Sequence, residues 1–280
     1  MSGMVIAVPS RMTYIKTREG HKLYVKDWGK GRPVILLHGW PLSADSWDEA
    51  AMAIAAAGFR AISYDRRGFG RSAQPFDGYD YDTLSDDLAA VMQETGATDA
   101  TLAGFSMGGG EVARYMSRHG GKNVKQAALV ASVVPYMLKT ADNPDGTDQA
   151  VFAKMTEAMK KDRAHFFGGF FKDFFGGKAS DETLEWARKT ALEASFKATL
   201  DCAKAFATTD FRPDLPAFKV PTLVIHGTGD KTVPIDASAR AAVKGIRGAK
   251  LIEYKGAPHG LFATEEKDQL AKDLIAFLKS

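Results

Sequence analysis

The residues Gly104-Phe105-Ser106-Met107-Gly108 form a G-x-S-x-G pattern between an apolar segment that reads as a strand and a segment with helical spacing. In a nucleophile elbow of this pattern, the serine sits on a sharp, strained turn that exposes its hydroxyl. Small residues on either side let the strand and the helix pass closely without collision of side chains. The pattern alone is a weak signal, but its place between a strand and a helix favours Ser106 as a nucleophile.

A second pattern overlaps the first. Residues 108–113, Gly-Gly-Gly-Glu-Val-Ala, match the G-x-G-x-x-A loop of dinucleotide-binding proteins. That loop requires an acidic residue about 20 positions later, at the end of the following strand. The apolar segment 129–134 contains none, so the sequence disfavours a dinucleotide site.

A nucleophilic serine needs a base, and His259 is the best placed of the six histidines. It lies on the expected loop between the last strand and the last helix, from which an imidazole can reach across to Ser106. His226 ends a strand and reads as a buried structural residue. His38 follows a strand directly before Gly39 and is expected to support the loop there.

The third member of such a site is a carboxylate on another loop that follows a strand. Asp230 lies four residues past the end of the expected strand over residues 222–226. The chain order Ser106, Asp230, His259 is the nucleophile, acid and base order of this architecture. Asp65 also follows a strand, but its neighbours Arg66 and Arg67 favour a structural ion pair there.

Acyl transfer also requires hydrogen-bond donors for the oxyanion that develops in the transition state. The amide after the nucleophile, that of Met107, is one candidate. The second candidate is the amide of Trp40, on the loop after the preceding strand, because Pro41 has no N–H. Proline fixes its own φ and restrains the residue before it, so Pro41 is expected to hold the backbone of Trp40.

The elements that must position these residues are strands alternating with helices, which is typical of βαβ units. The first two strands are predicted to form an antiparallel hairpin. Ser46 and Glu49 are predicted to form a capping box, and the last helix is predicted to start near Thr264. The sequence therefore predicts an α/β fold with a mostly parallel eight-stranded sheet, helices on both faces, and ligands beyond the carboxyl ends of the strands. The expected strands span residues 12–17, 21–28, 34–37, 59–64, 101–103, 127–134, 222–226 and 250–254.

One long segment interrupts the alternation. Residues 135–215 read as helical and aromatic, and this region contains most of the 17 phenylalanines. We interpret it as a helical cap inserted into a core formed by residues 1–134 and 216–280. The alternative is that these residues simply enlarge the core.

Composition excludes several other classes of protein. The 280 residues are 45% apolar and 25% charged, with a net charge of +3, which is ordinary for a globular domain and too balanced for a nucleic-acid surface. The single cysteine, Cys202, excludes an intramolecular disulfide and a cysteine-built metal site, and reads as a small buried apolar residue. No apolar run approaches the length of a membrane span. The first ten residues show no secretory signal, so we expect a cytoplasmic enzyme.

Taken together, the motifs resemble the α/β-hydrolase superfamily, and within it the cofactor-free bacterial haloperoxidases or perhydrolases and their esterase and lactamase relatives. The stretches that carry the resemblance are His38-Gly39-Trp40-Pro41-Leu42, the run from Tyr64 to Ser72, the elbow through Glu111, and Ser132-Val133-Val134-Pro135-Tyr136. The resemblance implies a serine mechanism with no metal, no haem and no other cofactor. It also implies that a carboxylic acid and hydrogen peroxide give a peracid, which then oxidises halide in solution.

The expected function is therefore hydrolysis and perhydrolysis of small esters, with no nucleic-acid or membrane partner. The alternatives are an amide or lactam hydrolase with the same triad, and a non-catalytic binding protein on this fold. A haloalkane dehalogenase would need an aspartate in place of Ser106. The oligomeric state, including a homo-oligomer, stays open. We expect a small apolar pocket formed by Trp40, Pro41, Met107, Val133, Leu261 and Phe171.

Overall fold

The computed structural model describes residues 13–280. The chain begins there with an antiparallel hairpin of β1 (Tyr14–Lys16) and β2 (Lys22–Gly29), in which Tyr14 pairs with Tyr24. Gly20 occupies the left-handed region in the turn, with a φ of +87°. The predicted hairpin is therefore confirmed, whereas its expected first residue, Met12, and the expectation for the first ten residues lie outside the described part of the chain.

The described strands form one sheet of eight, in the order β1-β2-β4-β3-β5-β6-β7-β8. From β4 to β8 all neighbouring strands are parallel, and β2 joins β4 in the antiparallel sense. The predicted α/β fold with a mostly parallel sheet is confirmed. The remaining strands are β3 (Pro33–Leu37), β4 (Arg60–Tyr64), β5 (Ala100–Phe105), β6 (Val124–Val130), β7 (Thr222–Gly227) and β8 (Lys250–Tyr254).

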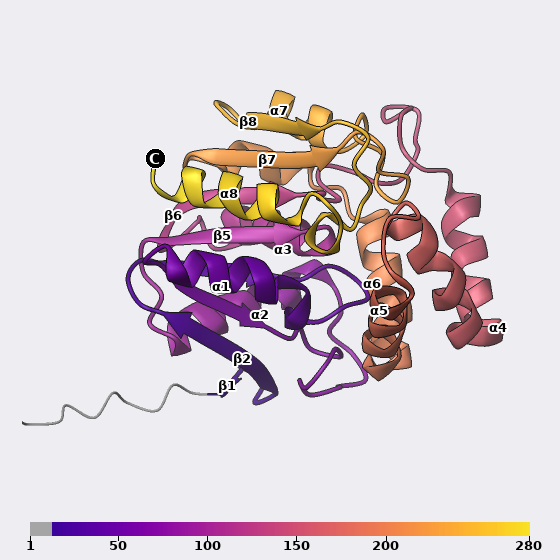
Figure 1. Ribbon diagram of the computed structural model, residues 1–280, viewed down its shortest axis with the longest axis horizontal. Helices are drawn as coiled ribbons and strands as arrows, with labels where there is room; N and C mark the ends of the chain where they lie inside the picture. The colour runs from indigo at the N-terminus through magenta and orange to yellow at the C-terminus, as the bar shows by residue number, and fades with distance from the viewer. Residues whose placement is uncertain (1–12) are drawn as a thin grey trace, which may run out of the picture.

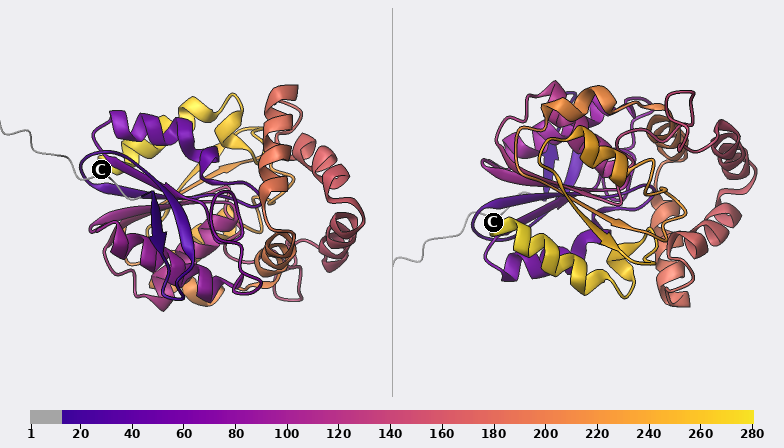
Figure 2. Two further views of the ribbon diagram at one scale, coloured as in Figure 1. Left: turned by 90° about the horizontal axis from the view of Figure 1, so that it is seen from below. Right: turned by 90° about the horizontal axis from the view of Figure 1, so that it is seen from above.

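Helices cover both faces of the sheet (Figure 2). One face carries α1 (Asp48–Ala56) and α8 (Lys267–Leu278), which contact each other, and the opposite face carries α2 (Tyr81–Glu94), α3 (Met107–Arg118) and α7 (Ala239–Gly245). Every residue of β3, β5 and β7 is buried, as expected for strands covered on both sides. Short 3₁₀ turns complete the core at η1 (Ala44–Trp47), η2 (Arg212–Ala217) and η3 (Leu261–Ala263).

Three local predictions are wrong at element boundaries. The strand expected over residues 127–134 ends at Val130, because Ala131 has a φ of +44° and leaves the extended conformation. Ser46 does not cap α1: its hydroxyl donates to the carbonyl of Ser43, and the turn η1 runs directly into the helix. The last helix begins at Lys267 rather than near Thr264, since η3 takes up the preceding residues.

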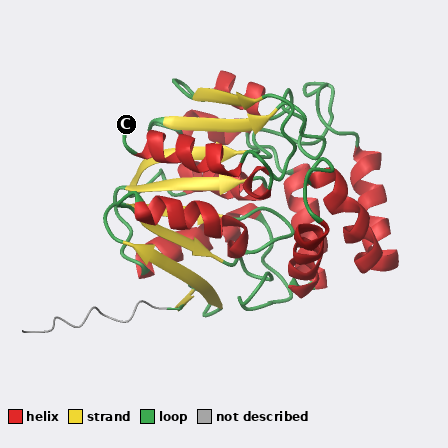
Figure 3. Cartoon of the chain, in the orientation of Figure 1, coloured by secondary structure: helices red, strands yellow, loops and turns green. Residues whose placement is uncertain are grey.

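A helical insertion lies between β6 and β7, as predicted. It consists of α4 (Gln149–Phe174), α5 (Asp181–Glu193) and α6 (Phe196–Thr208), and α4 is interrupted by the non-helical backbone of Asp162. Figure 1 shows these helices together beyond one end of the sheet, with the C-terminus at the other end. In Figure 3 the arrows of the parallel strands point toward this insertion, with loops between the two layers.

The insertion covers the loops that follow the parallel strands. Phe167, Phe171, Phe174 and Phe175 are all fully buried there. Cys202 is buried in α6, where burial raises the pKa of its thiol, so it behaves as the apolar residue that the sequence predicted. No helix within residues 13–280 is long and apolar enough to span a membrane.

Candidate active site

The elbow predicted from G-x-S-x-G is present between β5 and α3. Ser106 has φ and ψ of 53° and −118°, a backbone strain that sits at functional turns in other proteins. The flanking glycines permit this turn. A Cβ on Gly108 would lie 2.5 Å from the carbonyl oxygen of Leu37, and one on Gly104 would collide with the carbonyl of Gly108.

Ser106, His259 and Asp230 meet at the carboxyl end of the sheet. Nε2 of His259 lies 2.9 Å from Oγ of Ser106, and Nδ1 lies 2.6 Å from Oδ2 of Asp230. All three side chains are buried, and Ser106 keeps 6% of its surface exposed. The three residues come from loops after β5, β8 and β7, and the sequence analysis selected each of them.

The Asp230 carboxylate is held from several sides. Its Oδ1 accepts the amides of Thr232 at 2.9 Å and Val233 at 2.8 Å. Burial alone would raise the pKa of Asp230, but the imidazoles of His259 and His226 outweigh burial and hold the pKa well below its usual range. The acid is therefore ionised across the neutral pH range, as an orienting partner for an imidazole must be.

The loop after β3 runs beside the serine. A Cβ on Gly39 would approach the Cβ of Ser106 to 3.0 Å. The amide of Met107 is the first of α3, where the helix supplies no acceptor. The amide of Trp40 makes no backbone hydrogen bond within residues 13–280. Among the described residues, both predicted oxyanion donors are thus free of backbone acceptors. The indole of Trp40 donates to the carbonyl of Thr199 in α6 at 3.0 Å.

A buried ion pair between Arg66 and Glu111 supports the loop after β3. Nε of Arg66 donates to Oε1 of Glu111 at 2.6 Å, and its guanidinium also donates to the carbonyl of His38. Tyr64 donates to the other oxygen of Glu111 at 3.0 Å. Glu111 lies in the first turns of α3, so the pair ties the nucleophile helix to the loop that carries Trp40.

His38 supports the loop as the sequence predicted. Nε2 accepts the amide of Arg66 at 2.9 Å, and Nδ1 lies 2.9 Å from the carbonyl of Gly39. A carbonyl only accepts, so the proton is on Nδ1. Burial, and then the neighbouring Arg66, lower the pKa of His38 well below its ordinary value. The ring is a neutral structural link.

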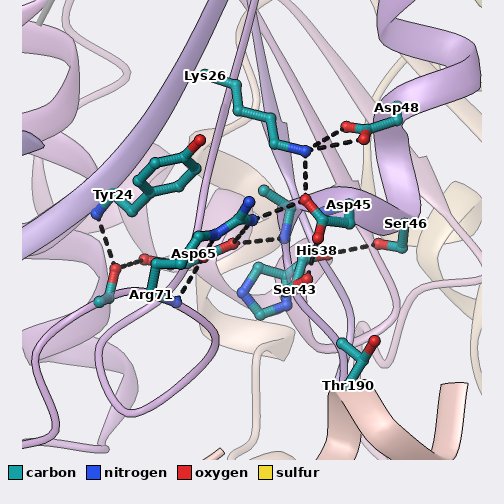
Figure 4. Close-up of polar contacts among 12 residues, drawn as sticks. Tyr24, Lys26, His38, Ser43, Asp45, Ser46, Asp48, Asp65, Arg71 and Thr190 are labelled. Carbon is teal, nitrogen blue, oxygen red and sulfur yellow. Dashed lines mark hydrogen bonds and ion pairs between the residues drawn. The ribbon is translucent and has the colours of Figure 1, made fainter. Parts of the chain in front are cut away.

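A charged network fixes the next part of the same loop (Figure 4). Asp65 accepts the amide of Ala44 at 2.8 Å and the Nε of Arg71 at 2.7 Å. Arg71 and Lys26 both pair with Asp45. Asp65 is thus structural, as predicted, but the expected partners were wrong. Arg66 and Arg67 turn away from it to Glu111 and Asp87, because side chains of consecutive residues leave the backbone in different directions.

Comparison with known proteins agrees with this geometry. The family model described as the alpha/beta hydrolase fold matches residues 32–266. The chain belongs to the α/β-hydrolase fold family. It is 40% identical to a bifunctional esterase/perhydrolase of Acinetobacter calcoaceticus, over 96% of this chain and all of the relative. It is 39% identical to a non-heme chloroperoxidase of Kitasatospora aureofaciens, over 95% of this chain and 99% of the relative. The crystal structure of a bromoperoxidase from Bacillus anthracis superposes with a TM-score of 0.92 at 41% identity, covering 95% of this chain and 99% of the other. The resemblance inferred from the motifs is confirmed.

The predicted pocket residues of this hydrolase are all buried. The amide of Val133 donates to the carbonyl of Ser106 at 3.3 Å. Leu261 is the first residue of η3, two positions after His259. Trp40 packs against Phe170 and other aromatic rings of the insertion, at a centroid distance of 5.4 Å, and the adjoining Pro41 is buried. Phe171 lies one layer farther out, against Phe174 at 5.6 Å.

Three features of this α/β-hydrolase site were not predicted from the sequence. The ring of Phe174, rather than that of Phe171, lies against the imidazole of His259, with 4.8 Å between their centroids. The Arg66–Glu111 pair joins residues far apart in the chain. His226 is buried as expected, yet its Nε2 lies 3.1 Å from Oδ2 of Asp230. A histidine four residues before the acid was the only available signal for this contact.

The described residues offer no metal centre. Within residues 13–280, no group of three or more histidine, cysteine, aspartate or glutamate side chains is arranged to hold a metal ion.

Proposed function

We propose that this protein is a serine hydrolase that acts on small esters through an acyl-enzyme, and that it also passes the acyl group to hydrogen peroxide. The observation that carries the proposal is the continuous chain of contacts from Ser106 Oγ to His259 (2.9 Å) and from His259 to Asp230 (2.6 Å). A serine hydroxyl, an imidazole and a buried carboxylate in this order constitute an activated nucleophile.

In the first half of the proposed reaction, Nε2 of His259 takes the proton of Ser106 as Oγ attacks the ester carbonyl. The imidazolium is stabilised by Asp230, which stays ionised. The amides of Trp40 and Met107 donate to the oxyanion of the tetrahedral intermediate. His259 then gives its proton to the leaving alcohol, which departs and leaves the acyl group on Ser106.

In the second half, water or hydrogen peroxide attacks the acyl-enzyme and His259 again removes a proton. Water gives the carboxylic acid, and peroxide gives the peracid with its O–O bond intact. In both cases Ser106 recovers its proton from His259. The peracid route also operates from a carboxylic acid and peroxide, and the released peracid oxidises halide in solution. The similarity to an esterase/perhydrolase and to a chloroperoxidase supports both outcomes.

The proposed substrates have short or aromatic apolar acyl groups. Trp40, Pro41, Met107, Val133 and Leu261 line the proposed pocket, with Phe171 one layer farther out against Phe174, and these side chains carry no charge. We further propose that residues 135–215 act as a cap over a core of residues 1–134 and 216–280. The burial of the phenylalanine rings against the loops of the sheet supports this division.

One variant and one substrate panel test the proposal. Ser106→Ala should abolish ester hydrolysis and peroxide-dependent halogenation together, and should prevent labelling by a fluorophosphonate probe. Halogenation that survives in the variant would refute a shared nucleophile. A panel of p-nitrophenyl acetate, a lactam, and acetate with peroxide then ranks the reactions, and a lactam turned over faster than the ester would assign the protein to amide hydrolysis instead.

A further inference from the structure

His226 is a buried histidine that the mechanism above does not use. It is the next-to-last residue of β7 and is fully buried. Its Nε2 lies 2.9 Å from the carbonyl oxygen of Val233 and 3.1 Å from Oδ2 of Asp230. Since a carbonyl only accepts hydrogen bonds, Nε2 carries the proton.

The surroundings of the other ring nitrogen, Nδ1, define the charge of the His226 side chain. Nδ1 of His226 is buried and has no hydrogen-bond partner within residues 13–280. A protonated Nδ1 would leave a charged donor unpaired in the interior, which is strongly unfavourable. The ring is therefore the neutral tautomer with its single proton on Nε2, which is 2.9 Å from the Val233 carbonyl oxygen and 3.1 Å from Oδ2 of Asp230.

This proton completes the environment of the Asp230 carboxylate. Oδ1 accepts two amides, those of Thr232 and Val233. Oδ2 faces two ring nitrogens, Nδ1 of His259 at 2.6 Å and Nε2 of His226 at 3.1 Å. With donors on both oxygens, the carboxylate has no free direction into which it can rotate.

Resting on the proposed catalytic roles of Ser106, Asp230 and His259, we propose that His226 is a positioning residue that holds Asp230 through its Nε2–H. It acts from the end of β7, a strand whose residues are all buried. Its contact with the Val233 carbonyl fixes the same residue whose amide holds Oδ1. The loop and the carboxylate are thereby fixed as one unit.

The proposed role has an electrostatic consequence. A donor close to Oδ2 makes the carboxylate less basic, so it moderates the stabilisation of a protonated His259 by Asp230. Glu253 on β8 is the register partner of His226, and its carboxylate is paired with Arg240 at 2.7 Å. Removal of the donor should therefore stabilise the protonated form of His259. The acid limb of the activity profile, where activity falls as the pH is lowered, then moves to higher pH.

Two substitutions with the same amide chemistry but different reach provide the test. In His226→Gln, the side-chain amide nitrogen takes the place of Nε2 and keeps a donor near Oδ2. In His226→Asn, the amide is too short to reach it, and His226→Leu removes the donor altogether. The assay is hydrolysis of p-nitrophenyl acetate from pH 5 to pH 9, followed at the isosbestic wavelength of p-nitrophenol.

We expect Asn and Leu to lower kcat by between about 10-fold and 100-fold, the effect of a misplaced catalytic group, with KM nearly unchanged. Their acid limb should move up by about half a pH unit or more, and Gln should restore most of both properties. If His226→Leu does not fold, the comparison of Gln with Asn decides the question.

His119→Leu is the matched control, because it also removes a contact between a histidine and an aspartate, Asp86 at 2.8 Å, at the far end of α3. An Asn variant that is folded by its unfolding temperature and has unchanged kcat and acid limb would overturn the proposal. So would equal losses in Gln and Asn, or a lower kcat with an unmoved acid limb. Hydrolysis that persists in Ser106→Ala would instead overturn the proposed function itself.

Discussion

The substitution Glu111→Gln tests whether the buried ion pair beneath the active site holds the loop that carries Trp40. Glutamine has nearly the same shape as glutamate and can still accept from Arg66, so the change removes mainly the charge. Both partners are at most 1% exposed. Arg66 would then be a buried cation without a counterion, and removal of one partner of a buried pair typically destabilises a protein by about 3–5 kcal/mol.

This magnitude converts into a measurable change in unfolding temperature. Unfolding entropy is about 2.1 cal/mol/K per residue, which for 280 residues is roughly 0.6 kcal/mol/K. The loss of about 3–5 kcal/mol therefore lowers Tm by about 5–9 °C. Because Arg66 also holds the His38 carbonyl, kcat for p-nitrophenyl acetate should fall as well, by about tenfold, the equivalent of about 1.4 kcal/mol in the barrier.

The assay is calorimetric unfolding at neutral pH with steady-state hydrolysis on the same samples. Glu185→Gln is the control, since it breaks the exposed Lys189–Glu185 pair at 2.7 Å, and exposed pairs contribute little. The double variant Arg66→Met/Glu111→Leu should recover part of the lost stability, because no charge remains buried alone. A Tm for Glu111→Gln within 1 °C of the control, with normal kcat, would refute the supporting role of this pair.

Four further outcomes are expected. Asp230→Asn should lower kcat by up to about 10⁴-fold while the fold persists, and near-normal turnover would show that the acid is misassigned. The pKa of Asp230 is lowered in the folded chain, so the ionised carboxylate stabilises the fold at pH values above its ordinary pKa near 4. That stabilisation is lost as the pH falls. The free energy of unfolding of Asp230→Asn should therefore depend less on pH between 5 and 3 than that of the parent. Pro41→Leu should shift the products from peracid toward acid by relaxing the backbone of Trp40. The ratio of peracid to acid changes about tenfold if the barriers for attack by peroxide and by water change by about 1.4 kcal/mol relative to each other. An unchanged ratio at matched peroxide concentration would make Pro41 purely structural. Ester hydrolysis should be indifferent to EDTA, since the proposed steps use only side chains and amides, and a strict requirement for an added divalent metal would contradict it.

The sequence predicts the core and the triad well because both depend on local patterns. The parallel strands are short, mostly apolar runs, and each proposed catalytic residue lies on the loop that follows one of them. Ser106 is marked by the glycines that its turn requires, and His259 and Asp230 are marked by their positions after the last strands. Parallel topology then brings these loops to one edge of the sheet.

The supporting contacts could not be predicted in the same way. Arg66 and Glu111 are separated by 45 positions, and nothing near either residue specifies the other. His226 was correctly expected to be buried, but its contact with Asp230 depends on how the following loop turns back. The ring of the insertion that lies against His259 belongs to Phe174 rather than Phe171, a difference set by the rotation of α4 and not by composition.

The hydrogen bond from the Trp40 indole to the Thr199 carbonyl bears on how new specificities can arise in this scaffold. The acceptor is a main-chain atom, so it is supplied by any amino acid at that position as long as α6 keeps its path. Side chains of the insertion can therefore diversify without loss of this anchor. In a directed-evolution library, randomisation of residue identities in α6 should be tolerated far better than insertions or deletions that displace the helix.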